Sequence, residues 1–166
     1  MNLSLRYPQL TDEAEALRLH ELAKADDFHF LLVAGTFEDQ VATIEREARG
    51  DVPPGWVPAD FYFAIVDGDI IGRISVRHAL TDHLLEVGGH IGYWVAPDHR
   101  RKGYATEMLR LGLDRLRALG LDRALVTCDD SNAASAKTIE RNGGILEDIR
   151  QLDHESEPKR RYWIDL

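Results

Sequence analysis

Cysteine is almost absent from this 166-residue chain, in which Cys128 is the single one. One cysteine cannot form an internal disulfide framework, and its scarcity suits a reducing compartment. Long apolar runs are also missing, since none approaches the roughly 20 residues that cross a bilayer. The first residues, MNLSLRYPQLTDEAEAL, contain neither the basic nor the apolar region of a secretory signal. These absences predict a cytoplasmic protein with no membrane segment.

Basic residues are in deficit, with 20 Lys and Arg against 29 Asp and Glu and a net charge of −9. Nucleic-acid binding needs a broad basic face that neutralises phosphates, so no nucleic-acid partner is expected. A cationic substrate fits the acidic balance, and solubility alone explains it equally well. The length and the 44% hydrophobic content predict one globular domain, residues 1–166.

Hydrophobic periodicity predicts strands and helices in the order β-α-α-β-β-β-α-β-α-β-β. Asp67-Gly68 is typical of a two-residue hairpin turn, and Thr36 and Ser131 are suitable helix N-caps. Residues 78–90 are too many for a tight hairpin, so they are either a mobile substrate-binding loop or a solvated connector. This mixture predicts an α/β (α+β) sheet domain.

The stretch HRRKGYAT, residues 99–106, lies between a predicted strand and a predicted helix. The first N–H groups of a helix and the helix dipole form an anion site, and Gly103 lets a ligand approach the backbone closely. Arg100, Arg101 and Lys102 add three positive charges. A phosphate or pyrophosphate fits these converging donors, although a charge run is as often a solvated turn.

Known phosphate motifs do not match, because neither a P-loop nor a G-x-G-x-x-G is present. The pattern Arg100-x-x-Gly103-x-Ala105 instead resembles the pyrophosphate-binding signature of the GNAT superfamily of N-acetyltransferases. The segment SNAASAKTIERNGG is similar to the next helix of that family, with Asn132 and Ser135 at the expected offsets. The order of strands and helices is similar as well.

The resemblance implies a mixed, mostly antiparallel sheet with splayed central strands flanked by helices, and acetyl-CoA as cosubstrate. The pantetheine arm would pair with the free edge of the strand at residues 93–95, and the N–H of Val95 would polarise the thioester carbonyl. The residues expected to bind the cofactor are Tyr93, Trp94, Val95, Arg100, Arg101, Lys102, Gly103, Tyr104, Ala105, Thr106, Asn132 and Ser135.

The implied activity is direct acetyl transfer to a primary amine, which requires a base. Many relatives carry a tyrosine acid where this chain has Ile139, and some carry a glutamate base where it has Thr127. Neither role can therefore be transferred. Candidate catalytic residues are His90, with an unperturbed pKa near 6.5, together with Glu86 and Asp129.

Other residues are assigned more simply. The histidines lack metal-ligand spacing, so no metal is expected. Cys128 is predicted to be an inert core thiol, and Trp56 and Trp94 belong either to the acceptor site or to the core. The acceptor is a small-molecule or peptide amine, and a homodimer is compatible with the sequence. The alternative to an enzyme is a non-catalytic acyl-CoA-binding or sensing module, which the departures at Ile139 and Thr127 motivate.

Overall fold

The computed structural model of the chain describes residues 1–32 and 34–166. No helix in this part of the chain is both long and apolar enough to cross a membrane. Short 3₁₀ turns lie at Leu10–Asp12, Lys24–Asp26 and Pro97–His99. The strands are β1 (Leu3–Arg6), β2 (Ala59–Val66), β3 (Asp69–Arg77), β4 (Ile91–Val95), β5 (Arg123–Asp129), β6 (Ile145–Arg150) and β7 (Lys159–Asp165), and the α-helices are α1 (Glu13–Ala23), α2 (Phe37–Ala48), α3 (Asp82–Glu86), α4 (Tyr104–Ala118) and α5 (Ala133–Arg141).

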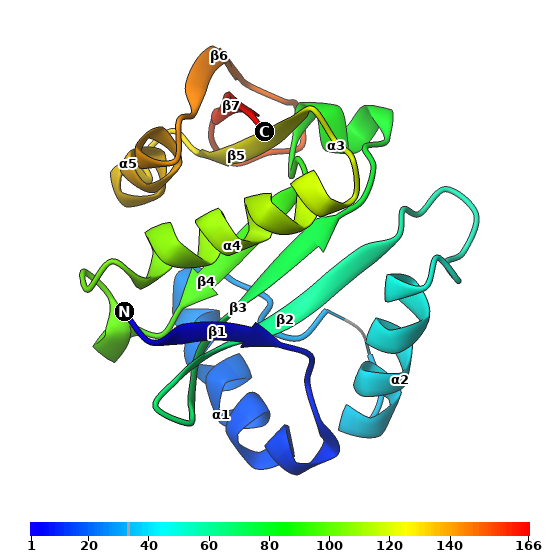
Figure 1. Cartoon of the computed structure of the whole chain (residues 1–166). Helices are drawn as coiled ribbons and strands as arrows, with labels where there is room; N and C mark the ends of the chain where they lie inside the picture. Colours follow the sequence, from blue (N-terminus) through cyan, green and yellow to red (C-terminus); the bar gives the residue numbers. More distant parts are fainter. Residues whose placement is uncertain (33) are drawn as a thin grey trace.

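The strands form two antiparallel sheets, ordered β1-β2-β3-β4 and β5-β7-β6 (Figure 1). The sheets meet at an isolated bridge between Gly89 and Val126. The N–H of His90 also donates to the carbonyl oxygen of Leu125 at 2.8 Å. Beyond this junction β4 and β5 are not paired within the described residues. The predicted mixed fold with splayed central strands is therefore confirmed.

Helices cover both faces of the larger sheet (Figure 1). The inward side chains of α1 and α2 pack on one face, against Phe61 and Phe63 of β2. The other face packs against α4, which also contacts the smaller sheet and so holds the two sheets together. Gly112 permits this close approach, because a Cβ there would lie 2.9 Å from Ile74 Cδ1.

Several local predictions are confirmed and one is corrected. Thr36 caps α2 as expected, accepting a hydrogen bond from the N–H of Asp39 at 3.1 Å. The N-cap of α5 is Asn132 rather than Ser131, because the Asn132 side chain accepts from the Ser135 N–H while Ser131 Oγ bonds Glu157. Residues 78–90 contain the one-turn helix α3, which the hydrophobic periodicity did not predict.

Candidate active site

The edge of β4 that faces β5 carries backbone groups that β3 does not use. The N–H of Ala96, directly after β4, donates to the carbonyl oxygen of Ile71 in β3 at 2.8 Å, so Ala96 and Ile71 occupy a hydrogen-bonded position of the ladder. Such pairs alternate along antiparallel strands, so the N–H groups of Ile91, Tyr93 and Val95 point away from β3. They point toward the splay, where a peptide-like ligand can pair with them.

The turn before α4 presents a row of backbone donors. Arg101 and Gly103 both have left-handed φ values, 59° and 85°. Among the described residues, the N–H groups of residues 101–106 donate no hydrogen bond. Unpaired N–H groups and the helix dipole together favour an anion. The geometry fits the expected pyrophosphate, whose contacts here stay a prediction.

The three cations of this turn are not equally free. Arg100 donates to the carbonyl oxygen of Val95 at 2.9 Å and forms an ion pair with Asp26. Its charge is therefore already paired within the protein, and a contact with a ligand anion stays a prediction. Lys102 Nζ donates to the Asp98 carbonyl oxygen at 2.8 Å. Arg101 forms no ion pair with any described residue.

Three of the residues expected to bind cofactor meet between β4 and α5. The Tyr93 hydroxyl lies 2.8 Å from Ser135 Oγ, and Asn132 Oδ1 accepts from the Ser135 N–H at 3.0 Å. Burial raises the pKa of Tyr93 to about 12, so its hydroxyl stays protonated. Ile139 is fully buried in the core. Tyr93 thus places a proton donor beside the helix that lacks the tyrosine of many relatives.

The two tryptophans that the sequence left open have different environments. Trp94 is 6% exposed and its Nε1 donates to Asp26 at 2.8 Å, so its side chain belongs to the core. Its backbone N–H points to β3, opposite Arg73, so a contact of Trp94 with the cofactor stays a prediction. Trp56 is exposed and lines a cavity instead.

This cavity, of about 440 Å³, lies on the face of the larger sheet that α1 and α2 cover. Its apolar wall comes from α2, β2 and the loop around Trp56. Its polar groups come from α2, β3 and the turn that contains α3, and they include Glu47, Ser75, Arg77 and His83. The cavity offers an acceptor both apolar contact and charged groups, which is typical of a small-molecule site.

His90 connects the larger sheet to Leu125 of the smaller sheet. Its side chain is 5% exposed, and its Nδ1 accepts from the N–H of Leu125 at 2.9 Å. Burial lowers its pKa to about 4, which corrects the value near 6.5 expected from sequence. A base role for His90 stays a prediction, but its lone pair on Nδ1 is already occupied.

Glu86 and Asp129 each face a cation rather than the cavity. Arg150 Nη1 lies 3.9 Å from Glu86 Oε1, and Lys159 Nζ forms an ion pair with Asp129. Neither carboxylate lines the cavity. The three candidate bases each have a different partner, Leu125, Arg150 and Lys159, and their catalytic roles stay predictions.

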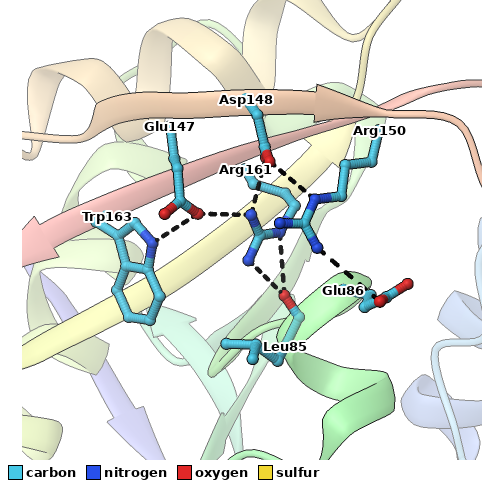
Figure 2. A network of polar contacts seen from close by, with 7 residues as sticks. All are labelled: Leu85, Glu86, Glu147, Asp148, Arg150, Arg161 and Trp163. Carbon is cyan, nitrogen blue, oxygen red and sulfur yellow. Dashed lines mark hydrogen bonds and ion pairs between the residues drawn. The ribbon is translucent and has the colours of Figure 1, made fainter.

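The turn that contains α3 is anchored to the smaller sheet by a polar network (Figure 2). Arg161 of β7 is 2% exposed and donates to the carbonyl oxygen of Leu85 at 2.7 Å and 3.0 Å. The same guanidinium bonds Glu147 and Asp148 at 2.5 Å and 2.8 Å. Further along, Thr127 Oγ1 accepts from the N–H of Gly88 at 3.0 Å. These anchors favour a fixed wall of the cavity over a mobile loop.

Two kinds of cavity residue were missed from the sequence. Glu47 follows Phe37, Val41 and Ile44 on the inward side of α2, so a charged residue on an apolar stripe was the available signal. The polar alternation of Arg73, Ser75 and Arg77 in a central strand was the second signal.

No group of three or more metal-ligating side chains was found among residues 1–32 and 34–166.

Comparisons with known proteins agree with this geometry. The family model described as acetyltransferase (GNAT) domain matches residues 2–145. A mycothiol acetyltransferase from Thermobispora bispora is 28% identical over 148 residues, which cover 84% of this chain and 49% of that protein. The chain therefore spans about half the length of this curated relative.

Solved structures share the fold at low sequence identity. Mycobacterium smegmatis RimJ, solved in complex with CoA-disulfide, has a TM-score of 0.76 and 20% identity over 98% of this chain and 81% of that one. A Salmonella typhimurium acetyltransferase that modifies the N-terminal serine of ribosomal protein L7/L12 has a TM-score of 0.72 and 19% identity over 100% and 96%. On the family match across residues 2–145, the chain belongs to the acetyltransferase (GNAT) domain family.

Proposed function

We propose that the chain is an acetyl-CoA-dependent N-acetyltransferase that moves the acetyl group directly to a primary amine. The observation that carries this is the free edge of β4 leading into the unpaired N–H groups of residues 101–106. A strand edge and an anion site in series match a ligand with a peptide-like arm and a pyrophosphate.

The residues around the splay fit acetyl-CoA as cosubstrate. The N–H groups of Tyr93 and Val95 would hold the arm, and the Val95 N–H would stabilise developing charge on the thioester oxygen. Residues 101–106 and the side chains of Arg101 and Lys102 would bind the pyrophosphate. The protonated hydroxyl of Tyr93, bonded to Ser135, would assist the leaving thiolate.

Direct transfer is supported by the state of the single cysteine. Cys128 is buried, and burial raises its pKa to about 11. The thiolate is the nucleophilic form, so a thiol with this pKa is poorly suited to form an acyl-enzyme. The acceptor amine would therefore attack the thioester itself.

The position of Glu47 in the cavity favours it as the group that binds and deprotonates the acceptor amine. It lines the cavity, and burial raises its pKa, although Arg46 partly opposes this. A carboxylate with a raised pKa is better matched to proton removal near neutral pH. His90, Glu86 and Asp129 remain alternative bases. An amine on a small molecule or on a peptide N-terminus fits the proposal, in a cytoplasmic setting without nucleic acid.

Two-substrate kinetics test the proposal. CoA thiol release would be followed with a disulfide indicator while acetyl-CoA and amine concentrations are both varied. Direct transfer predicts an amine-dependent rate, intersecting double-reciprocal lines and no burst. Parallel lines with a burst would indicate an acyl-enzyme. Tight acetyl-CoA binding without turnover over a broad amine panel would favour the sensing module.

A further inference from the structure

Three polar residues of β3 form a row on the cavity face of the sheet. Ile74 and Val76 face α4, so the alternation of a strand puts Arg73, Ser75 and Arg77 on the opposite face. Arg73 Nη1 donates to Ser75 Oγ at 2.7 Å. Ser75 and Arg77 line the cavity, and Arg73 lies behind Ser75. The Ser75 hydroxyl, which accepts from Arg73, keeps its own proton to donate.

Neither arginine has a carboxylate partner among the described residues. Arg73 is 5% exposed, its Nη2 donates to the carbonyl oxygen of His29 at 2.7 Å, and its guanidinium lies 4.5 Å from the Phe28 ring. Its Nε is buried with no hydrogen-bond partner in the described structure. Burial, together with the charge of Arg77, lowers the pKa of Arg73 to about 9. Buried charge without a counter-ion is costly, so this pair of cations lacks an anion.

Arg77 contacts the junction of the two sheets through one nitrogen of its guanidinium. Its Nη1 donates to the carbonyl oxygens of Gly88 and Gly89, at 3.3 Å and 3.0 Å. Within the described residues its Nε and Nη2 make no hydrogen bond. Gly89 is the residue that bridges to Val126, where β4 and β5 begin to separate. Because Arg77 also lines the cavity, its unbonded Nε and Nη2 remain for an anion bound there, close to this junction.

The rest of the cavity complements an amine with an apolar body. Glu47 is the carboxylate from α2, and Ile44, Trp56 and Phe61 contribute apolar surface. The cavity of about 440 Å³ therefore combines the guanidinium of Arg77, a carboxylate and an apolar wall. A cavity of this size and lining suits a small molecule that carries one positive and one negative charge.

We propose that the acceptor is an amino acid with an apolar side chain, and that Arg77 and Ser75 bind its free carboxylate. This assignment rests on the proposed N-acetyltransferase function and names the substrate class of the same site. Arg77 offers the planar donor pair that matches a carboxylate, and Ser75 adds a hydroxyl donor. Arg73 is a positioning residue, because it orients Ser75 and adds positive potential behind it.

Matched acceptor pairs test the assignment. Leucine, methionine and phenylalanine would each be compared with the corresponding amide, which keeps the amine and the side chain but removes the negative charge. We expect kcat/KM for the acid to exceed that for its amide by about 10- to 100-fold in at least one pair, as a charged hydrogen bond provides. Amides that are acetylated as well as or better than the acids in every pair would overturn the assignment and leave the transferase function intact.

Variants of the cavity residues show which side chain causes the preference for the acid over its amide. Arg77→Gln should bring the acid-to-amide ratio close to one, and Arg77→Lys should restore only part of it because the planar donor pair is lost. Ser75→Ala should reduce the ratio a few-fold, which a merely structural role of the Arg73–Ser75 contact would not do. Arg18→Gln, on the exposed side of α1, is the control and should leave the ratio unchanged. An unchanged ratio in Arg77→Gln would place the carboxylate elsewhere and contradict the proposal.

A binding experiment tests the carboxylate site without requiring turnover. Calorimetric titration without acetyl-CoA would use 4-methylpentanoate and 3-phenylpropanoate against their neutral amides. We expect the carboxylates to bind the wild type more tightly and to lose this advantage in Arg77→Gln. Equal binding of acid and amide would overturn the assignment whether or not the chain is an enzyme. Failure of acetyl-CoA to bind, with the carboxylate preference intact, would contradict the proposed function alone.

Discussion

His90 and Leu125 exchange two hydrogen bonds across the junction of the sheets: the His90 N–H donates to the Leu125 carbonyl oxygen, and His90 Nδ1 accepts from the Leu125 N–H. We expect His90→Ala to lower the free energy of unfolding by about 1–3 kcal/mol, because it leaves a buried N–H unpaired. His90→Gln, which keeps an acceptor, should cost less. Chemical denaturation measures both. Equal losses would show that the Nδ1 contact contributes nothing.

The same residue predicts a pH dependence of stability. The pKa of His90 is lowered to about 4, below the value near 6.5 of an unfolded histidine. Between these values the unfolded state binds a proton that the native state does not, so stability is complete at higher pH and falls as pH decreases. Denaturant unfolding near pH 7 and near pH 5 should show this decrease in the wild type. His90→Gln should show a smaller decrease, and an identical one would contradict the assignment to His90.

Gly103 should be required for cofactor binding through its backbone. Its φ of 85° is strained for any other residue, and it precedes the first turn of α4. Gly120, with a φ of 86° and open space around it, is a matched control at the other end of the helix. Both Gly→Ala changes should destabilise by about 1–2 kcal/mol. Only Gly103→Ala should lose the rise in melting temperature that CoA produces; the same loss in Gly120→Ala would count against an anion site.

Glu47 should control amine deprotonation. We expect Glu47→Gln to lower kcat/KM for the amine by about 10²-fold or more and to flatten the acidic limb of its pH profile. Glu45→Gln, an exposed position on the same helix, is the control and should have wild-type kinetics. If Glu47→Gln keeps both rate and profile, the base is one of the other candidates.

Arg161 should stabilise the cavity wall from the smaller sheet. Arg161→Ala removes the donors to the Leu85 carbonyl oxygen and the partner of Glu147, which is exposed, and of Asp148, and should cost about 1–3 kcal/mol, as an unpaired acceptor inside the protein does. Arg150→Ala, at the exposed side of the same network (Figure 2), should cost about 0–1 kcal/mol. Thermal and chemical unfolding of the two variants would measure this difference. Equal costs would mean that burial of Arg161 adds no stability.

Local patterns were sufficient to predict most of the fold. The Asp67-Gly68 turn adopts the two positive φ values of a tight hairpin, and α2 begins at its Thr36 cap as periodicity and capping residues indicate. The short helix α3 was missed because five residues carry too little periodicity, and its anchors to β5 and β7 are far apart in sequence.

Long-range contacts explain the remaining differences at the site. The RRKG turn predicts an anion site, but the pairing of Arg100 with Asp26 joins residues 74 positions apart and leaves no local signal. His90 looked suited to base catalysis because strand alternation alone does not reveal that its ring is buried against Leu125. The polar alternation of Arg73, Ser75 and Arg77 can be read in the sequence of β3. That these residues face a cavity depends on the helix α2, which covers this face of the sheet.

Product analysis tests the central claim most directly. Purified protein would be incubated with acetyl-CoA and a panel of primary amines that includes apolar amino acids and N-terminal serine peptides. Mass spectrometry would then quantify free CoA and acetylated amine. We predict that the two products form in equal amounts and only when protein and amine are both present. Free CoA without acetylated amine, or no product although acetyl-CoA is bound, would contradict an N-acetyltransferase.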